Sequence, residues 1–482
     1  MDGRAHGTGV TRRWHGLAAA VVLQAAAGAG AVAAPAGDAL QRALVNLQAD
    51  PRPTVFAGHP RLIVGGYRGV PVAELRAACA RPELRGQCDA LGGRHVLDDA
   101  MRYLVAGDRA AADRVAAQLR GLTACRDGDV GSEHSPWGGL ALAFDWVWDA
   151  LPDVERRRLD ALWPSCAAAL ARQLDGNGPH LWHGYTSLAA SEALVALAID
   201  DPAGRAAALP KAVEHFRQRA LEAYAVVGGA WPEGYNYLRS HFFSADPPSQ
   251  YVMDALRAWD SAIERDTTEH ASLFGTIAAD EGDWLRGLGH HILYGTLDGY
   301  GPGGKRTLLR GGDMPTGQAW PNKQVRPFVD SIARVTGDGH LAKWGRDLEA
   351  DWPFVGGDGT YHPIHRYSLP YNLPLDVPSR APDEPSGAAG DEAAGGALPL
   401  GRIWGRTDLG YVLARSAWGP GETTLGYRAG AWFTGHQHMD QGHLDLWRKG
   451  PLAVDAGVYA NWGTAHREAF YARTVAHNTL LI

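Results

Sequence analysis

The sequence has fewer basic than acidic residues: it contains 46 lysines and arginines and 53 aspartates and glutamates, so the formal net charge is −7. A protein that binds nucleic acid through its phosphates needs a cationic surface, so this balance argues against DNA or RNA as a partner. An anionic sugar stays open as a substrate, because a small cationic cleft can form on an acidic protein.

Long apolar runs are also scarce, and none beyond the first 34 residues is long enough to span a bilayer. The exception is the alanine-rich run Leu17–Ala34, which follows Arg12 and Arg13 and ends before Pro35. A charged start, an apolar run and small residues at its end are typical of a cleaved signal peptide. We therefore expect residues 1–36 to be removed on export to the periplasm or the medium, and no stable membrane span.

Cysteine is rare, with 4 residues in 482, and none has the C-x-x-C spacing of a metal site. An even number of cysteines in an exported chain indicates disulfides. The four residues allow three pairings, of which Cys79–Cys88 closes the shortest loop, and the remaining two are Cys125 and Cys166.

A chain of 482 residues is too long for one ordinary hydrophobic core, so two domains are expected. Between about Leu97 and Val355, apolar residues recur at helical spacing, and Gly, Pro or Asp marks the segment ends. Successive helical pairs favour an incomplete α/α toroid, which we assign to residues 37–375. Helices are expected at 38–47, 97–106, 110–122, 140–150, 154–174, 188–199, 211–227 and 251–263.

Residues 376–398 are rich in Pro, Gly, Ala and acidic residues, which indicates a linker or mobile loop. Beyond it the apolar period changes to two, so residues 399–482 are expected to form an antiparallel β-sandwich-type domain. The predicted class is therefore α+β with several domains. Strands are expected at 410–416, 423–427, 443–448, 452–455 and 479–482. The chain stops inside the last strand, so we expect an incomplete β-domain.

Histidines and aspartates that could act in catalysis or bind a metal are concentrated in residues 432–482. This stretch contains the motifs H-x-H-x-D-x-G, D-x-G-x-Y and T-x-A-H-N-T, in that order. If residues 435–440 are extended, His436, His438 and Asp440 share one face, because strand side chains alternate. One face would then carry both a metal ligand and a reacting histidine.

Imidazole and carboxylate together are a ligand set that zinc accepts. His438, Asp455 and His477 come from three separate segments and are the candidate ligands. His443 and His466 are competing ligands that the sequence does not exclude.

The order, spacing and flanking glycines of these three motifs resemble the C-terminal domain of the heparinase II/III-like polysaccharide lyases. That family includes heparin and heparan lyases, which act on glycosaminoglycans, and oligo-alginate lyases. The resemblance implies that His436 lies in the active site and that His438, Asp455 and His477 bind zinc. Because the implied reaction needs no hydrolytic water, we expect the zinc to be mainly structural.

Two stretches of the helical region resemble the catalytic motifs of the same lyases: L-W-H-G-Y at 181–185 and G-G-A-W-P-E-G-Y-N-Y at 228–237. The resemblance implies catalytic roles for His183 and Tyr237. The secondary, substrate-binding candidates are Glu233, Asn236, Arg239 and Tyr471.

The implied reaction is β-elimination in a uronate-containing polysaccharide or oligosaccharide. A base removes the proton α to the carboxylate, an acid protonates the departing oxygen, and positioned donors neutralise the developing charge. Tyr237 is the expected acid and a candidate base for one uronate epimer. His183 is the other base or a carboxylate neutraliser, and His436 supports the developing charge.

Two other functions stay open from the sequence. A glycoside hydrolase on a helical toroid needs two opposed carboxylates, for which Glu233, Asp246 and Asp313 are available. A non-catalytic glycan-binding protein could retain the same fold. Nothing in the sequence indicates the oligomeric state.

Overall fold

The structure, a computed structural model, describes residues 54–93, 95–125, 135–176, 181–221, 223–224, 227–242, 252–263, 284–314, 325–351, 369–372, 376–384, 397–405 and 409–479. The expected signal peptide, the expected helix at 38–47 and residues 385–396 of the expected linker lie outside this part of the chain.

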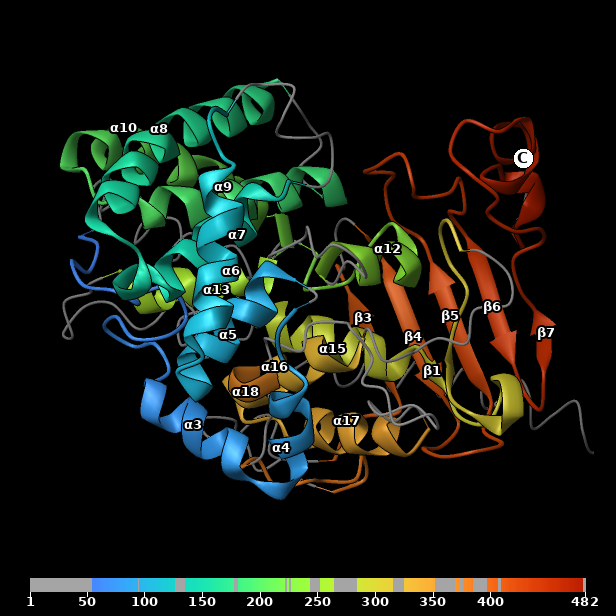
Figure 1. Cartoon of the computed structure of the whole chain (residues 1–482). Coiled ribbons are helices and arrows are strands. Elements are labelled where there is room, and N and C mark those ends of the chain that lie inside the picture. The colour runs from blue at the N-terminus through green and yellow to red at the C-terminus, as the bar shows by residue number, and fades with distance from the viewer. Residues whose placement is uncertain are drawn as a thin grey trace, which may run out of the picture.

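A helical region is followed by an antiparallel sheet, as predicted (Figure 1). The α-helices are α3 (Val72–Ala80), α4 (Pro82–Asp89), α5 (Val96–Ala106), α6 (Arg109–Arg120), α7 (Trp137–Trp146), α8 (Asp153–Asp175), α9 (His183–Ala198), α10 (Pro202–Ala212), α12 (Gly234–Phe242), α13 (Val252–Ala262), α15 (Trp284–Tyr294), α16 (Arg326–Thr336), α17 (Gly339–Asp351) and α18 (Leu369–Asn372). Within the described residues, no helix combines the length and the apolarity that a bilayer span requires.

Helix α9 is the centre of the helical region, where it packs against α7, α8 and α13 (Figure 1). All of its residues are buried. A helix that is buried on every side has no polar face, so periodicity does not mark its ends. The sequence predicts its start at Leu188, whereas the structure starts it at His183, which places that histidine in the first turn.

The helix predicted at 211–227 is wrong in its bounds. Helix α10 begins at Pro202 because the Asp201 side chain accepts a hydrogen bond from the Gly204 backbone N–H at 2.6 Å and proline suits a first helical position. The chain then continues as a π-helical segment, Val213–Leu221.

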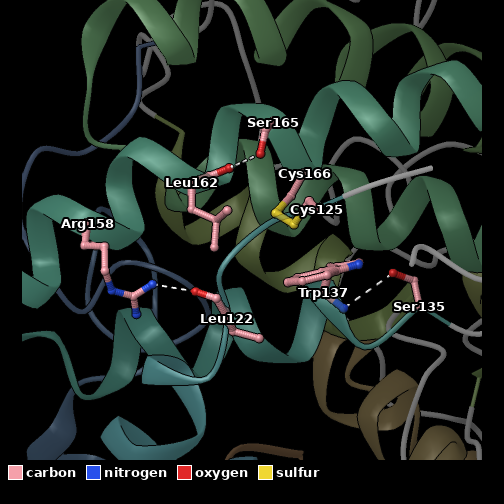
Figure 2. Close-up of a disulfide and its surroundings, with 8 residues drawn as sticks. All are labelled: Leu122, Cys125, Ser135, Trp137, Arg158, Leu162, Ser165 and Cys166. Atoms are coloured by element: carbon pink, nitrogen blue, oxygen red, sulfur yellow. Dashed lines mark hydrogen bonds between the residues drawn. A yellow bond between two sulfur atoms is a disulfide. The ribbon is translucent and has the colours of Figure 1, made fainter. Parts of the chain in front are cut away.

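Two disulfides, Cys79–Cys88 and Cys125–Cys166, lie in the helical region. The second ties the segment after α6 to α8, as Figure 2 shows. Beside it, Arg158 of α8 donates a hydrogen bond to the carbonyl oxygen of Leu122. The end of α6 is therefore fixed to α8 both covalently and by hydrogen bonding.

His59 joins the first described segment to the helices. Its Nδ1 lies 2.6 Å from Asp145 Oδ1 and its Nε2 lies 3.0 Å from Asp200 Oδ2. Burial alone would lower the pKa of His59, but the hydrogen bonds to both carboxylates outweigh burial and raise it above the ordinary 6.5. Burial likewise opposes ionisation of Asp200, but His59 and Arg61 lower the pKa of that carboxyl to about 2.

We expect His59 to make folding stability pH-dependent. Because its folded pKa is raised, its stabilising contribution is complete below about pH 6.5 and is lost as the pH rises through the folded value. His59→Gln should therefore unfold at a lower urea midpoint than the wild type at about pH 6, and the difference should shrink by about pH 9. The control is His466→Gln, an exposed histidine. If the urea midpoints of His59→Gln and the wild type differ by the same amount across this pH range, His59 is not the source of the pH dependence.

The sheet is an antiparallel meander in the order β3-β4-β5-β6-β7. Its strands are β3 (Gly401–Trp404), β4 (Tyr411–Arg415), β5 (Thr424–Arg428), β6 (His443–Trp447) and β7 (Pro451–Ala453), and a separate short pair is β1 (Thr296–Leu297) with β2 (Thr307–Leu308). Four of the predicted strands are confirmed, and β3 was not predicted. The strand predicted at 479–482 is not a strand at Thr479, and the rest lies outside the described residues.

Alternation along the strands puts polar side chains on the buried face of the sheet. Arg428, His443 and Asp445 are all buried, and Arg428 and His443 are direct cross-strand partners. The opposite face is partly exposed at Leu444 and exposed at Tyr427. A buried face with charged groups is unusual for a packing surface and indicates a site.

The condition under which His436, His438 and Asp440 would share one face, an extended segment at 435–440, is not met. These residues belong to the loop between β5 and β6, where the Gln437 N–H donates to the Thr434 carbonyl oxygen at 3.2 Å. Gly442 returns the chain to β6 with φ +84°, a conformation that glycine adopts without strain. His436 and His438 therefore do not share a strand face, and the loop sends them to two neighbouring sites.

Candidate active site and metal site

Three aromatic side chains meet where the helical region faces the sheet. His183 comes from the first turn of α9, Tyr237 from α12 and His436 from the β5–β6 loop. The ring centroids of Tyr237 and His436 are 3.9 Å apart, those of Tyr237 and His183 are 4.6 Å apart, and those of the two histidines are 5.1 Å apart. The structure thus brings together the three residues predicted to be catalytic.

Glu233 lies behind His183 and is fully buried. Its Oε2 lies 3.0 Å from His183 Nδ1 and accepts the backbone N–H of His183 at 3.1 Å. Its Oε1 accepts the Thr434 hydroxyl at 2.8 Å. With Glu233 Oε2 as the acceptor, His183 carries its hydrogen on Nδ1, and Nε2 is the basic nitrogen of the neutral ring. Glu233 orients His183, and this buried position leaves it no surface for substrate.

Tyr237 holds its phenolic proton tightly. Its hydroxyl lies 3.1 Å from the hydroxyl of Tyr459. Burial first, and then the hydrogen bond with Tyr459, raise the pKa of Tyr237 well above its ordinary value of 10. Tyr459 was not assigned from the sequence, although it is the tyrosine of the D-x-G-x-Y motif.

Asp313, one of the three carboxylates that the sequence makes available for a hydrolase, lies behind His436. Its Oδ2 is 2.7 Å from His436 Nδ1 and its Oδ1 is 3.0 Å from His438 Nε2. Burial opposes ionisation, but the hydrogen bonds from the two imidazoles and the charge of Arg467 keep the pKa of Asp313 below its usual value. Asp313 is therefore an ionised acceptor.

The secondary candidates have supporting positions. The Asn236 side chain donates to the Asp313 carbonyl oxygen at 3.0 Å. The Tyr471 hydroxyl donates to the Gly312 carbonyl oxygen at 3.0 Å, and its ring is 3% exposed. The side chain of Arg239 lies outside the described part of the structure. Asn236 and Tyr471 thus hold the turn that carries Asp313.

The predicted zinc ligands form one cluster. Ligand atoms of His438, Asp455 and His477 lie within 4.8 Å of one another, and all three residues are buried. His438 Nδ1, Asp455 Oδ2 and His477 Nε2 have no hydrogen-bond partner among the described residues. Buried nitrogen and oxygen atoms are rarely left unpartnered, and two imidazoles with one carboxylate are a zinc ligand set. These residues fit the metal.

The charge around this cluster also favours a cation. Arg428 pairs with Asp440, lies 3.0 Å from Asp445 Oδ2 and lies 3.9 Å from Asp455 Oδ2. Burial raises the pKa of Asp445, which disfavours the charged form of this carboxyl. Even with Asp445 neutral, negative charge exceeds the charge of the guanidinium, and buried charge is costly unless it is compensated.

The two competing ligands, His443 and His466, differ in their surroundings. The Asn478 backbone N–H donates to His443 Nδ1 at 3.0 Å, so the hydrogen of the neutral His443 ring is on Nε2. That nitrogen lies 3.1 Å from both Asp445 Oδ1 and Asp455 Oδ1 but makes no hydrogen bond within the described residues. His443, Asp445 and Asp455 therefore form a second buried group that could hold a metal ion beside the predicted one. His466 is exposed and does not belong to this cluster.

The C-terminal part of the chain is similar to a known protein family. Residues 400–482 match the family model for the heparinase II/III-like C-terminal domain. No curated protein sequence is a significant match. Among solved structures, a heparinase III is similar at 14% identity and a TM-score of 0.43, over 80% of this chain and 53% of that one. A second heparinase III, with methylated lysines, is similar at 13% identity and a TM-score of 0.29 over the same shares. This chain therefore spans about half the length of those proteins.

Proposed function

We propose that the protein is a polysaccharide lyase that cleaves a uronate-containing glycan by β-elimination, because residues 400–482 match the family model for the heparinase II/III-like C-terminal domain. The observation that carries the proposal is the convergence of His183, Tyr237 and His436 from three distant segments. In this arrangement, groups that move protons face one another, and the two nearest carboxylates, Glu233 and Asp313, are fully buried behind them.

Each side chain has a role in the proposed reaction. His183, oriented by Glu233, removes the proton from the carbon α to the uronate carboxylate through Nε2. The electron pair forms a carbon–carbon double bond as the bond from the β carbon to the glycosidic oxygen breaks. Tyr237, which starts protonated, gives its proton to that oxygen. His436 lies beside the carboxylate and, when its Nε2 is also protonated, stabilises the charge that develops there, while its Nδ1 hydrogen stays hydrogen-bonded to Asp313.

Zinc, if bound by His438, Asp455 and His477, would supply structural support through its bonds to three segments of the β-domain. His438 is two positions from His436 in the sequence. A metal ion bound to His438 would therefore hold the loop that presents His436. The proposed proton transfers use only His183 and Tyr237.

Hydrolysis fits this site less well. A glycoside hydrolase exposes two carboxylates on opposite sides of the glycosidic bond. Glu233 and Asp313 are each fully buried and are held by imidazole, hydroxyl or guanidinium donors. The third candidate, Asp246, lies outside the described residues.

Incubation with alginate, heparan sulfate, chondroitin sulfate and hyaluronan tests the proposal. We expect one of these polymers to yield products with the ultraviolet absorbance of an unsaturated uronate. New reducing ends without that absorbance indicate hydrolysis, and binding without either product indicates a glycan-binding protein. Export is part of the proposal, supported by the N-terminal pattern and the two disulfides.

A further inference from the structure

The turn that carries Asp313 is held against the turn that carries Glu233. A Cβ on Gly312, where φ is +61°, would lie 2.1 Å from the Glu233 carbonyl oxygen, and a Cβ on Gly234 would lie 1.8 Å from the Gly311 carbonyl oxygen. Glycine at these positions lets the two backbones touch. The Asp313 carboxylate is therefore presented from a rigid, fully buried backbone.

This carboxylate has three partners. His436 Nδ1 lies 2.7 Å from Oδ2, and His438 Nε2 lies 3.0 Å from Oδ1. Arg467 Nε donates to Oδ1 and Oδ2 at 3.0 and 2.9 Å. A guanidinium that donates to both oxygens favours the ionised carboxylate and balances its charge. The two imidazoles consequently need not be cationic to bind Asp313.

The contacts decide which nitrogen of each neutral ring carries the hydrogen. A carboxylate only accepts, so the hydrogens are on His436 Nδ1 and His438 Nε2. The basic nitrogens are then His436 Nε2 and His438 Nδ1. The latter is buried without a hydrogen-bond partner among the described residues, and His438 belongs to the cluster that fits zinc.

We propose that Asp313 is a positioning residue that fixes His438 for metal binding and His436 for the reaction at the same time. The two sites are linked because their histidines share one carboxylate. The His436 half rests on the proposed lyase function, whereas the His438 half concerns metal binding alone. A carboxylate that accepts the other ring N–H of a metal-binding histidine changes metal affinity by roughly 10- to 100-fold without touching the ion.

Asp313→Asn tests the metal half in the full chain. An amide offers one acceptor oxygen where the carboxylate offers two, so one histidine loses its acceptor. Zinc affinity, measured by competition with a chromogenic chelator, should fall about 10- to 100-fold. The matched control is Asp338→Asn, which disrupts another buried aspartate–histidine pair, at 2.9 Å from His290, and should leave zinc affinity unchanged. An Asp313→Asn protein with wild-type zinc affinity overturns the proposal.

The wild-type protein supplies a second measurement if the variant does not fold. Histidine-selective ¹⁵N NMR, with His436→Gln and His438→Gln for assignment, should find the hydrogens on His436 Nδ1 and His438 Nε2. The opposite tautomers overturn the proposal. Neither measurement uses a glycan. If the protein cleaves no polymer but meets both expectations, the lyase function is rejected and the role of Asp313 in metal binding is retained. In an active enzyme, Asp313→Asn should lower kcat more than it changes KM.

Discussion

Replacing Tyr237 with phenylalanine is expected to lower turnover about 100- to 10,000-fold, the range in which general acid–base groups contribute. The substitution removes only the hydroxyl, which lies 3.1 Å from the Tyr459 hydroxyl. The ring contacts to His436 and His183 remain. Losing one neutral hydrogen bond costs about 0.5–1.5 kcal/mol of folding free energy, so the fold should persist.

The measurement is the initial rate of unsaturated-product formation on the best polymer, together with substrate affinity and melting temperature. Tyr427→Phe is the control, because Tyr427 is on the exposed face of β5. The control should keep the wild-type rate. If Tyr237→Phe also turns over at a near-normal rate, Tyr237 is not the acid and the mechanism proposed here is wrong.

Replacing His438 with alanine is expected to abolish stoichiometric zinc binding and to lower the melting temperature by about 5–10 °C. At a zinc concentration one hundred times the dissociation constant, binding to the folded state alone stabilises it by about 2.7 kcal/mol. At the roughly 2–4 °C per kcal/mol found for domains of 150–250 residues, this free energy corresponds to the expected shift. Loss of the ion also leaves the buried carboxylates around Arg428 less compensated.

Zinc content by elemental analysis and unfolding by calorimetry, with and without a chelator, measure this effect. His466→Ala is the control, because that histidine is exposed and outside the cluster. The chelator should destabilise the wild type and the control but not the His438→Ala protein. A His438→Ala protein that keeps its fold, loses activity and regains it directly on zinc addition contradicts a structural role for the ion.

In the helical region, apolar periodicity predicts the bounds of some helices but not of others. Helices with one apolar face, such as α5 and α6, begin and end close to their predicted bounds. Helix α9 is buried on all sides, so its first turn, including His183, carries no periodic signal. For α10, the Asp201 cap and Pro202 mark the start of the helix in the sequence, ahead of the apolar pattern that begins near Lys211.

The sequence alone determined which side chains the C-terminal motifs supply, and the strands around them, because alternating burial leaves a period of two in the sequence. The path of the loop between β5 and β6 was decided by the tertiary structure, since its hydrogen bonds override local strand tendency. That path separates His436 from His438. Their common partner, Asp313, is 123 and 125 residues away, and a contact over such a distance leaves no local pattern because it forms only when the helical region packs on the sheet.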